Sequence, residues 1–145
     1  MNPRPIVVFD TQVILRAMLN PRSLPAKVFF EHGHQYFLAL SPATRQELQN
    51  VLLRPRLRAK YPTLTPMLIE RVMSILDAGL FVHPVDIPSV SRDPKDDIFL
   101  ATARLSEAQY LVTEDQDLLV LHPYGTLQII NVLKFWTILN QNLEG

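Results

Sequence analysis

The chemistry that this sequence could support rests on carboxylates in four separate segments: Asp10, Glu47, Asp96 and Asp115. Asp10 and Asp115 each follow closely on a short run of β-branched, aromatic or aliphatic residues, which is typical of the carboxyl end of a buried parallel strand. In an open parallel sheet the loops and helix N-termini converge beyond these strand ends, and ligands bind there. A single aspartate in this position more often only caps the next helix, but two such residues favour a shared site.

Segment 92–103 is predicted to form a helix that begins at Asp93-Pro94. Helical periodicity distinguishes its adjacent acids, Asp96 and Asp97. Asp96 lies at the N-terminal end of a stripe with i, i+3, i+4, i+7 spacing, which we expect to face the sheet. The other members of this stripe are Phe99, Leu100 and Ala103. Asp97 is rotated away by about 100°, so we expect it at most to adjust a contact outside the site. The alternative is that Asp96 only occupies the first helical turn, where the dipole favours negative charge, as in a capping box with Asp93.

Glu47 lies on another predicted helix, which begins with a capping hydroxyl and a proline at Ser41-Pro42. It borders the apolar stripe of this helix, whose members are Leu48, Val51 and Leu52. A glutamate on a helix flank is more often simply solvated. Glu47 therefore indicates a site only together with the three aspartates.

Four carboxylates within a few ångströms would repel one another by roughly 4 kcal/mol per close pair at an effective dielectric near 20, so such a site requires a cation. The chain has no cysteine, and the candidate ligands are oxygen atoms. Oxygen ligands suit Mg²⁺ or Mn²⁺ better than zinc or copper. Ions of this kind activate water and stabilise the leaving oxygen in phosphodiester hydrolysis. The acids therefore predict a hydrolytic metal centre.

The strands and helices that must position these acids alternate along the chain, which predicts an α/β fold with a mainly parallel central sheet flanked by helices. Apolar runs predict strands at residues 6–9, 36–40, 80–82, 110–112 and 127–130. A further helix is expected to begin after Thr65-Pro66 and to run to about Asp77, with Gly79 in the left-handed conformation that ends it. Asp115 is expected to cap a shorter helix.

Length and composition limit what the chain can be. Its 145 residues, 48% of them hydrophobic, suit a single domain, which we place at residues 1–140 with a frayed tail at 141–145. The apolar runs are too short to span a bilayer or to form a secretory signal, so we expect a cytoplasmic protein without a membrane partner. Fourteen basic residues balance fourteen acidic ones, which excludes a global positive field and leaves only local positive charge for nucleic acid.

Local positive charge is concentrated directly after the Glu47 helix, in a connector at residues 54–60. Its four cations are Arg54, Arg56, Arg58 and Lys60. Such cations contact phosphates and give affinity for RNA without a choice of sequence. An ordinary solvated connector is an equally good interpretation.

Taken in chain order, the acidic motifs resemble the PIN-domain ribonucleases over nearly the whole chain. The motifs are Asp10-Thr11-Gln12, Glu47, Asp96 with helix residues 100–103, and the Val-Thr-Glu-Asp-Gln-Asp stretch at residues 112–117. The resemblance is closest to the branch known as toxins of bacterial and archaeal toxin–antitoxin pairs. It implies a three-layer sandwich around the parallel sheet. It also implies metal-binding and catalytic roles for Asp10, Glu47, Asp96 and Asp115.

The same resemblance assigns accessory residues and partners. Thr113 would form hydrogen bonds within the site, Thr11 would support it, and Asp117 would be a fifth metal-binding acid. The implied cofactor is Mg²⁺ or Mn²⁺, the substrate is RNA, and the partners are a second copy of the chain and a cognate antitoxin protein. The family usually has asparagine two residues after its first aspartate, where this chain has Gln12, whose longer side chain can reduce activity.

Three other classes of protein share parts of this pattern. An inactive PIN-like module that binds RNA or protein is compatible with Gln12, although retention of all four acids argues against it. A two-component receiver domain needs an acidic pair after its first strand and a phosphorylated aspartate after a middle strand, but Asp10-Thr11 and Ser41-Pro42 stand there instead. A haloacid-dehalogenase-type phosphatase needs a second aspartate at position 12. A metal-dependent ribonuclease is therefore the predicted function.

Overall fold

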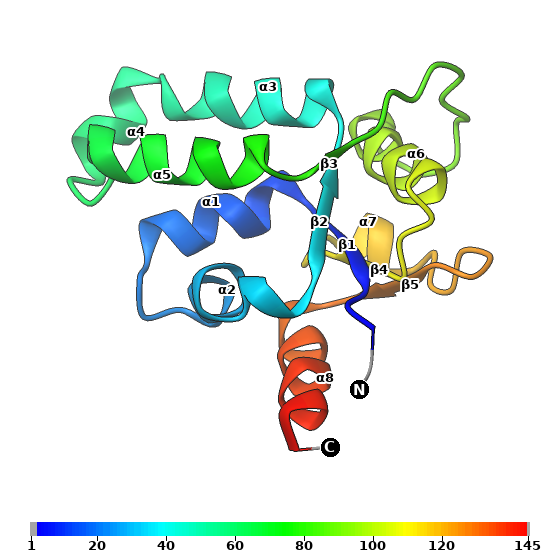
Figure 1. Ribbon diagram of the computed structural model, residues 1–145. Coiled ribbons are helices and arrows are strands. Elements are labelled where there is room, and N and C mark those ends of the chain that lie inside the picture. The colour runs from blue at the N-terminus through cyan, green and yellow to red at the C-terminus, as the bar shows by residue number, and fades with distance from the viewer. Residues whose placement is uncertain (1–2, 145) are drawn as a thin grey trace.

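The computed structural model describes residues 3–144, and the side chains of residues 3–141. Its centre is a five-stranded sheet in the order β3-β2-β1-β4-β5, in which all neighbouring strands run parallel (Figure 1). The strands are β1 (Ile6–Phe9), β2 (Phe37–Leu40), β3 (Leu80–Phe81), β4 (Tyr110–Val112) and β5 (Gln128–Ile130). Each agrees with its predicted range to within one residue at either end. The predicted α/β fold is confirmed, with a sheet that is wholly rather than mainly parallel.

The carboxyl ends of β1 and β4 lie side by side at the point where the strand order reverses. From β1 the chain adds β2 and β3 on one side, then crosses over to add β4 and β5 on the other. Phe9 is in register with Val112, and the amide of Asp10 donates to the Val112 carbonyl oxygen at 3.0 Å. Ligands bind beyond strand ends at such a reversal. The fold thus brings Asp10 and the segment after Val112 to the position where a site is expected.

Helices join the strands, and side-chain caps begin several of them. They are α1 (Thr11–Leu19), α2 (Leu24–Ala26), α3 (Pro42–Leu52), α4 (Pro55–Lys60), α5 (Pro66–Asp77), α6 (Asp97–Leu105), α7 (Gln116–Leu119) and α8 (Val132–Glu144). The chain also forms a π-helical turn, η1 (Lys27–Glu31), and two 3-10 turns, η2 (Gly33–Gln35) and η3 (Pro94–Asp96). Ser41 forms a capping box with Thr44 at α3, and the Thr65 side chain caps α5, as their sequence motifs predict. No helix of the described residues combines the length and apolarity needed to cross a membrane.

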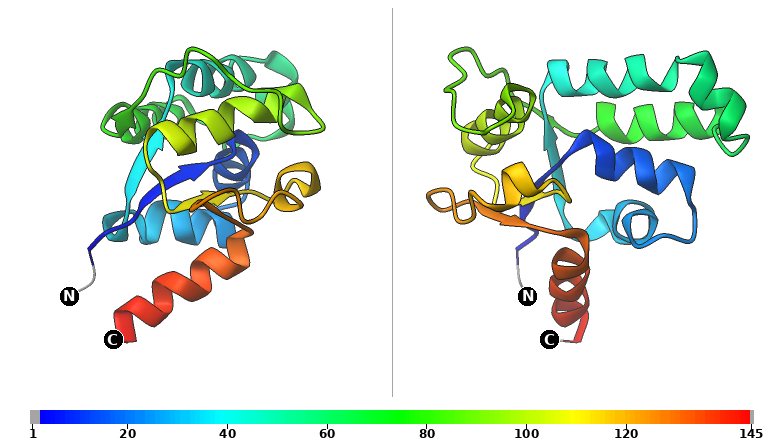
Figure 2. Two further views of the ribbon diagram at one scale, coloured as in Figure 1. Left: turned by 90° about the vertical axis from the view of Figure 1, so that its right-hand side faces the viewer. Right: turned by 180° about the vertical axis from the view of Figure 1, so that it is seen from behind.

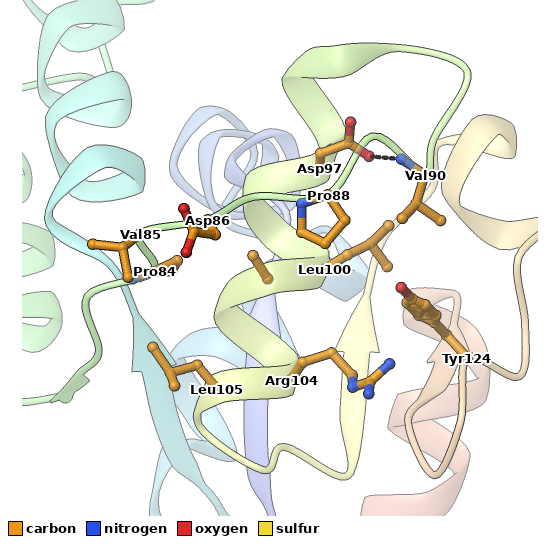
Figure 3. Close-up of a pocket in the computed structure, with 11 residues that line it drawn as sticks. Pro84, Val85, Asp86, Pro88, Val90, Asp97, Leu100, Arg104, Leu105 and Tyr124 are labelled. Carbon is orange, nitrogen blue, oxygen red and sulfur yellow. Dashed lines mark hydrogen bonds between the residues drawn. The ribbon is translucent and has the colours of Figure 1, made fainter.

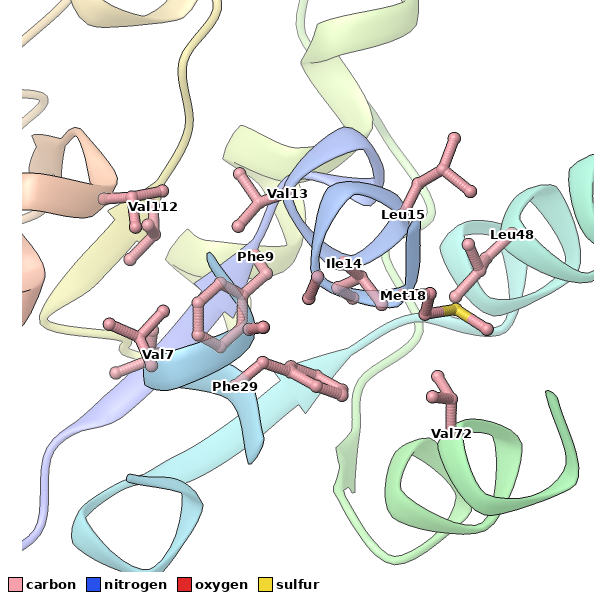
Figure 4. Packing of buried hydrophobic residues seen from close by; sticks show 14 of the residues in the cluster. Val7, Phe9, Val13, Ile14, Leu15, Met18, Phe29, Leu48, Val72 and Val112 are labelled. Carbon is pink, nitrogen blue, oxygen red and sulfur yellow. The ribbon is translucent and has the colours of Figure 1, made fainter. Parts of the chain in front are cut away.

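Helices cover both faces of the sheet (Figures 1 and 2). Alternate residues of the strands pack against the two helical layers. Val7 and Phe9 pack into the core shared with α1, α3, α5 and α8, and Figure 4 shows Phe9 beside Phe29 in this core. Val8 and Leu111 face the opposite way, into the smaller core of α6 and α7. Both faces of the sheet are therefore covered, which gives the predicted three layers. Burial of this apolar surface, worth roughly 25 cal/mol per Å², holds the strand ends that carry the acids.

The conformation of Gly79 differs from the sequence-based expectation. Gly79 is not left-handed, since the described glycine with positive φ is Gly125. A Cβ at Gly79 would instead lie 2.8 Å from the Leu38 carbonyl oxygen, so glycine is needed there because the end of α5 passes close to β2. The domain bounds 1–140 and the frayed tail at 141–145 stay a prediction. Helix α8 is described as far as Glu144, and Gly145 lies outside the described residues.

Candidate metal centre

Three carboxylates meet beyond the carboxyl end of β4. One oxygen each of Asp96, Asp115 and Asp117 lies within 4.8 Å of the others, in the part of the chain that the structure describes. Asp96 is the last residue of η3, and the two other acids begin α7. Asp96 is only 7% exposed, and its Oδ2 is the one buried side-chain nitrogen or oxygen of the described residues without a hydrogen-bond partner. A buried polar atom of this kind requires an explanation, and a bound cation supplies one.

Local capping accounts for some of these acids but not for Asp96. The Oδ1 of Asp115 accepts from the Asp117 amide at 2.9 Å and so caps α7, as the simpler interpretation of this residue predicts. The cap ahead of Asp96 is provided by Asp93, whose side chain accepts from the Lys95 amide at 3.0 Å. Asp96 itself forms no capping hydrogen bond. Helix capping therefore leaves the burial of Asp96 unexplained.

Thr113 connects the ends of β1 and β4. Its hydroxyl donates to Oδ2 of Asp10 at 2.8 Å, and the same oxygen of Thr113 accepts from the Asp115 amide at 3.0 Å. The Oδ1 of Asp10 accepts from the Gln12 amide at 3.1 Å, so Asp10 also caps α1. These contacts fix both oxygens of Asp10 beside the three-acid cluster.

The electrostatics of this edge are those of crowded carboxylates. Burial is the main cause that raises the pKa of Asp96 to about 7, and the nearby carboxylate of Asp115 and the charges of Asp93 and Asp10 act in the same direction. Burial also raises the pKa of Asp10, with a further increase from Asp115, while hydrogen bonds from Gln12 and Thr113 oppose it. A divalent cation would relieve this repulsion.

Glu47 lies at the rim of the acidic edge. It is exposed on α3 and does not contribute to the three-oxygen cluster. Partial burial and then the charge of Asp10 raise its pKa, while Lys95 and Arg54 lower it. Glu47 is thus close enough to feel the charge of Asp10, and two cations share its surroundings.

A hollow of about 240 Å³ opens beside Asp10 and Asp115 and contains residues that the sequence analysis did not assign to the site. Arg16 and Glu114 line it together with Gln12. The charge of Arg16 lowers the pKa of Asp10, which places this cation next to the acids. Helical spacing could have identified Arg16, because it lies four residues after Gln12 on the same face of α1.

Asp97 is not part of the three-acid cluster, and it has a structural role that the sequence pattern does not indicate. It is 5% exposed, and its Oδ1 accepts from the amides of Val90 and Ser91 at 3.1 and 2.7 Å. Figure 3 shows Asp97 bonded to Val90 at the edge of a hollow between α6 and the loop that precedes η3. Asp97 is therefore an anchor for this loop.

The remaining predicted residues surround the site. Thr11 is buried at the start of α1 and lines a small gap beside β2 and α3 rather than the acidic hollow. The basic segment is not a loose connector, since it forms α4 with Arg54 as its N-terminal cap residue. Arg54 lowers the pKa of Glu47, so the start of this segment reaches the acidic rim. The three other cations are exposed: Arg56, Arg58 and Lys60.

Comparison with known proteins agrees with this architecture. The family description "PIN domain" matches residues 6–117, and the chain belongs to this family. PIN domains are generally nucleases that hydrolyse phosphodiester bonds. The chain is 30% identical over 128 residues to the uncharacterized protein MJ1680 of Methanocaldococcus jannaschii, across 86% of this chain and 80% of that protein. The crystal structure of PAE2754 from Pyrobaculum aerophilum has the same fold, with a TM-score of 0.56 at 18% identity over 95% of this chain and 90% of that one.

The residues present fit a hard divalent cation. The clustered donors are all carboxylate oxygens, the ligands that Mg²⁺ and Mn²⁺ prefer. The buried Oδ2 of Asp96 lacks any other partner. The aspartate cluster could thus hold the divalent ion that is typical of PIN domains.

Proposed function

We propose that this protein is a divalent-metal-dependent endoribonuclease that uses Mg²⁺ or Mn²⁺. The observation that carries the proposal is the buried, unpartnered Oδ2 of Asp96 next to oxygens of Asp115 and Asp117. Asp10 and Glu47 extend the negative edge around this cluster. Such an arrangement is costly for a protein without a positively charged ligand, and family membership favours a nuclease.

The surrounding residues have separable parts in the reaction. When bound, a divalent ion supplies positive charge to phosphate oxygens and promotes ionisation of water. Asp96, Asp115 and Asp117 would hold it, with Asp10 held alongside by the hydrogen bond from Thr113. Arg16, next to Asp10, offers a positive charge to the phosphate that is cut.

The substrate and biological role are finer parts of the proposal and rest on the motif resemblance. RNA is the proposed substrate, and the exposed cations of α4, Arg56, Arg58 and Lys60, would contact its phosphates along with Arg54. We propose that the protein acts in the cytoplasm as the toxin of a toxin–antitoxin pair, as a homodimer that a cognate antitoxin restrains.

A cleavage assay with matched variants tests the proposed activity. Labelled RNA would be incubated with the protein in Mg²⁺, in Mn²⁺ or in EDTA, and we expect cutting with either ion and none in EDTA. Asp115→Asn should abolish cutting, whereas Asp77→Asn, which removes an exposed carboxylate paired with Arg45, should cut like the wild type. RNA that is bound but not cut in either ion would favour the inactive binding module instead.

A further inference from the structure

A groove adjoins the acidic hollow along α1. This groove is a second hollow of about 590 Å³ that shares Arg16 and Glu114 with the acidic hollow, so the two lie side by side. The second hollow lies between the end of α1, the turn that leads to α2, and the start of α8. A substrate phosphate at the acidic cluster would therefore have a hollow next to it for the adjoining nucleoside.

The floor of this second hollow is apolar and aromatic. Its apolar lining includes Leu19, Leu24, Pro25, Tyr61, Val132 and Leu133. Tyr61 is half-buried, and Leu133 is 59% exposed on the first turn of α8. Phosphates would be poorly solvated on such a floor, whereas the flat face of a nucleobase stacks well on tyrosine and aliphatic carbon.

The charges of the groove suit a nucleic-acid strand. Arg16 lines both hollows, and the Lys60 ammonium lies 5.5 Å from the ring centroid of Tyr61, which lines the second hollow. The lining includes one acid, Glu114, whose Oε1 accepts from the Val132 amide at 3.0 Å at the start of α8. Two cations thus lie beside an apolar lining, an arrangement that suits phosphates at the rim and a base against the lining.

The turn at the lip of the groove is held in one conformation by its own side chains. The Ser23 hydroxyl donates to the Asn20 carbonyl oxygen at 2.6 Å, and Oδ1 of Asn20 accepts from the Arg22 amide at 3.1 Å. The groove is therefore shaped before a ligand enters, which reduces the entropic cost of binding.

We infer that the groove from Arg16 to Tyr61 is a subsite that holds one unpaired base of a single-stranded substrate next to the phosphate at the acidic centre. The inference rests on the proposed ribonuclease function. A base inside a duplex is covered by its stacked neighbours and cannot offer its face to Tyr61, so the subsite selects single strands. Tyr61 and Leu133 are specificity-determining residues of this subsite.

The test compares Tyr61→Leu, Tyr61→Phe and Leu133→Ser in binding and cleavage. Binding of a labelled single-stranded RNA and of its duplex would be measured in EDTA by fluorescence anisotropy, and KM and kcat would be measured with Mg²⁺. We expect Tyr61→Leu and Leu133→Ser to weaken single-strand binding and raise KM by roughly 5- to 150-fold, the span for loss of one base stack. The kcat should stay within about threefold, Tyr61→Phe should restore binding, and duplex binding should be weak and unaffected.

Leu105→Ser is the matched control, because Leu105 is similarly exposed, at 54%, but lies on α6 across the sheet. It should bind and cut RNA like the wild type. Leu133→Ser alters only an exposed side chain, so it keeps the test decisive if Tyr61→Leu fails to fold.

The inference is overturned if wild-type cleavage is normal and neither groove variant changes KM. It is also overturned if Leu133→Ser dissociates a dimer without changing RNA affinity. A wild type that binds single strands through Tyr61 but never cuts would instead overturn the ribonuclease proposal, and a wild type that does neither would overturn both.

Discussion

Two regions at the start of α6 use buried aspartates in opposite ways. On one side, Asp96 faces Asp115 and Asp117 with an oxygen that has no partner. On the other, Asp97 accepts two backbone amides and holds the loop before η3 in place (Figure 3). The two neighbours are almost equally buried, at 7% and 5% exposure. Burial alone therefore does not identify a functional acid, whereas burial without a hydrogen-bond partner does.

The largest expected effect separates these neighbours by activity. Asp96→Asn keeps the shape of the side chain but removes charge from the cluster, so metal-dependent RNA cleavage should fall by roughly two to four orders of magnitude. Folding should survive because repulsion from Asp115 is relieved. Asp97→Asn, measured in the same cleavage assay, should lose far less. If Asp97→Asn is the more damaging change, the roles assigned to the two residues are reversed.

The acidic region should also respond to its ion in the absence of substrate. Binding to the folded state alone contributes about 2.7 kcal/mol at an ion concentration 100 times Kd, which raises the Tm by roughly 5–10 °C in a chain of this size. Asp115→Asn should remove most of this increase, and Asp97→Asn should retain it. A wild-type melting curve that millimolar Mg²⁺ and Mn²⁺ leave unchanged would speak against the acidic site.

The raised pKa of Asp96 gives the same region a pH dependence. Because that pKa is about 7 in the folded protein, against an ordinary value of 3.8, the folded state keeps a proton that the unfolded state has already released. The free energy of unfolding of the metal-free protein should therefore fall as pH rises between these two values and level off above them. The apparent affinity for Mn²⁺ should rise by up to about tenfold per pH unit below 7. Calorimetric titrations should show a shallower slope in Asp96→Asn than in the wild type, because only the raised pKa values of Asp10 and Glu47 remain there.

The loop anchor should affect stability rather than chemistry. Asp97→Ala removes the acceptor of two buried amides, which should lower the free energy of unfolding by about 1–3 kcal/mol. In urea unfolding, the free energy of unfolding should fall by the same amount in EDTA and in Mg²⁺, because Asp97 takes no part in binding the ion. A loss that appears only in Mg²⁺ would place Asp97 in the metal centre.

The sequence predicts those features of the fold and the site that arise from interactions between residues close together in the chain. The runs that form β1 and β4, and the caps at Ser41 and Thr65, act within a few residues, and their structures match the predictions. The separation of Asp96 from Asp97 also follows from helical geometry alone. The fold class follows from the alternation of strands and helices.

The unpredicted features depend on contacts between distant segments. The bond from Thr113 to Asp10 joins residues 103 positions apart and requires β1 and β4 to pair in register. The role of Asp97 depends on the path of the irregular loop before η3, for which the sequence offers no periodic pattern. Local rules favour a helix stop at Gly79, whereas glycine is needed there because β2 passes close to the end of α5.

The position of a bound ion tests the proposed metal centre most directly. A crystal of the protein grown with Mn²⁺ would locate the ion by its anomalous scattering, without reliance on activity or on the identity of the substrate. We expect a peak in contact with carboxylate oxygens of Asp96 and Asp115, with Asp117 beside it, and no ion at Asp97. A peak elsewhere on the chain, or none at a saturating concentration of Mn²⁺, would rule out the proposed metal centre.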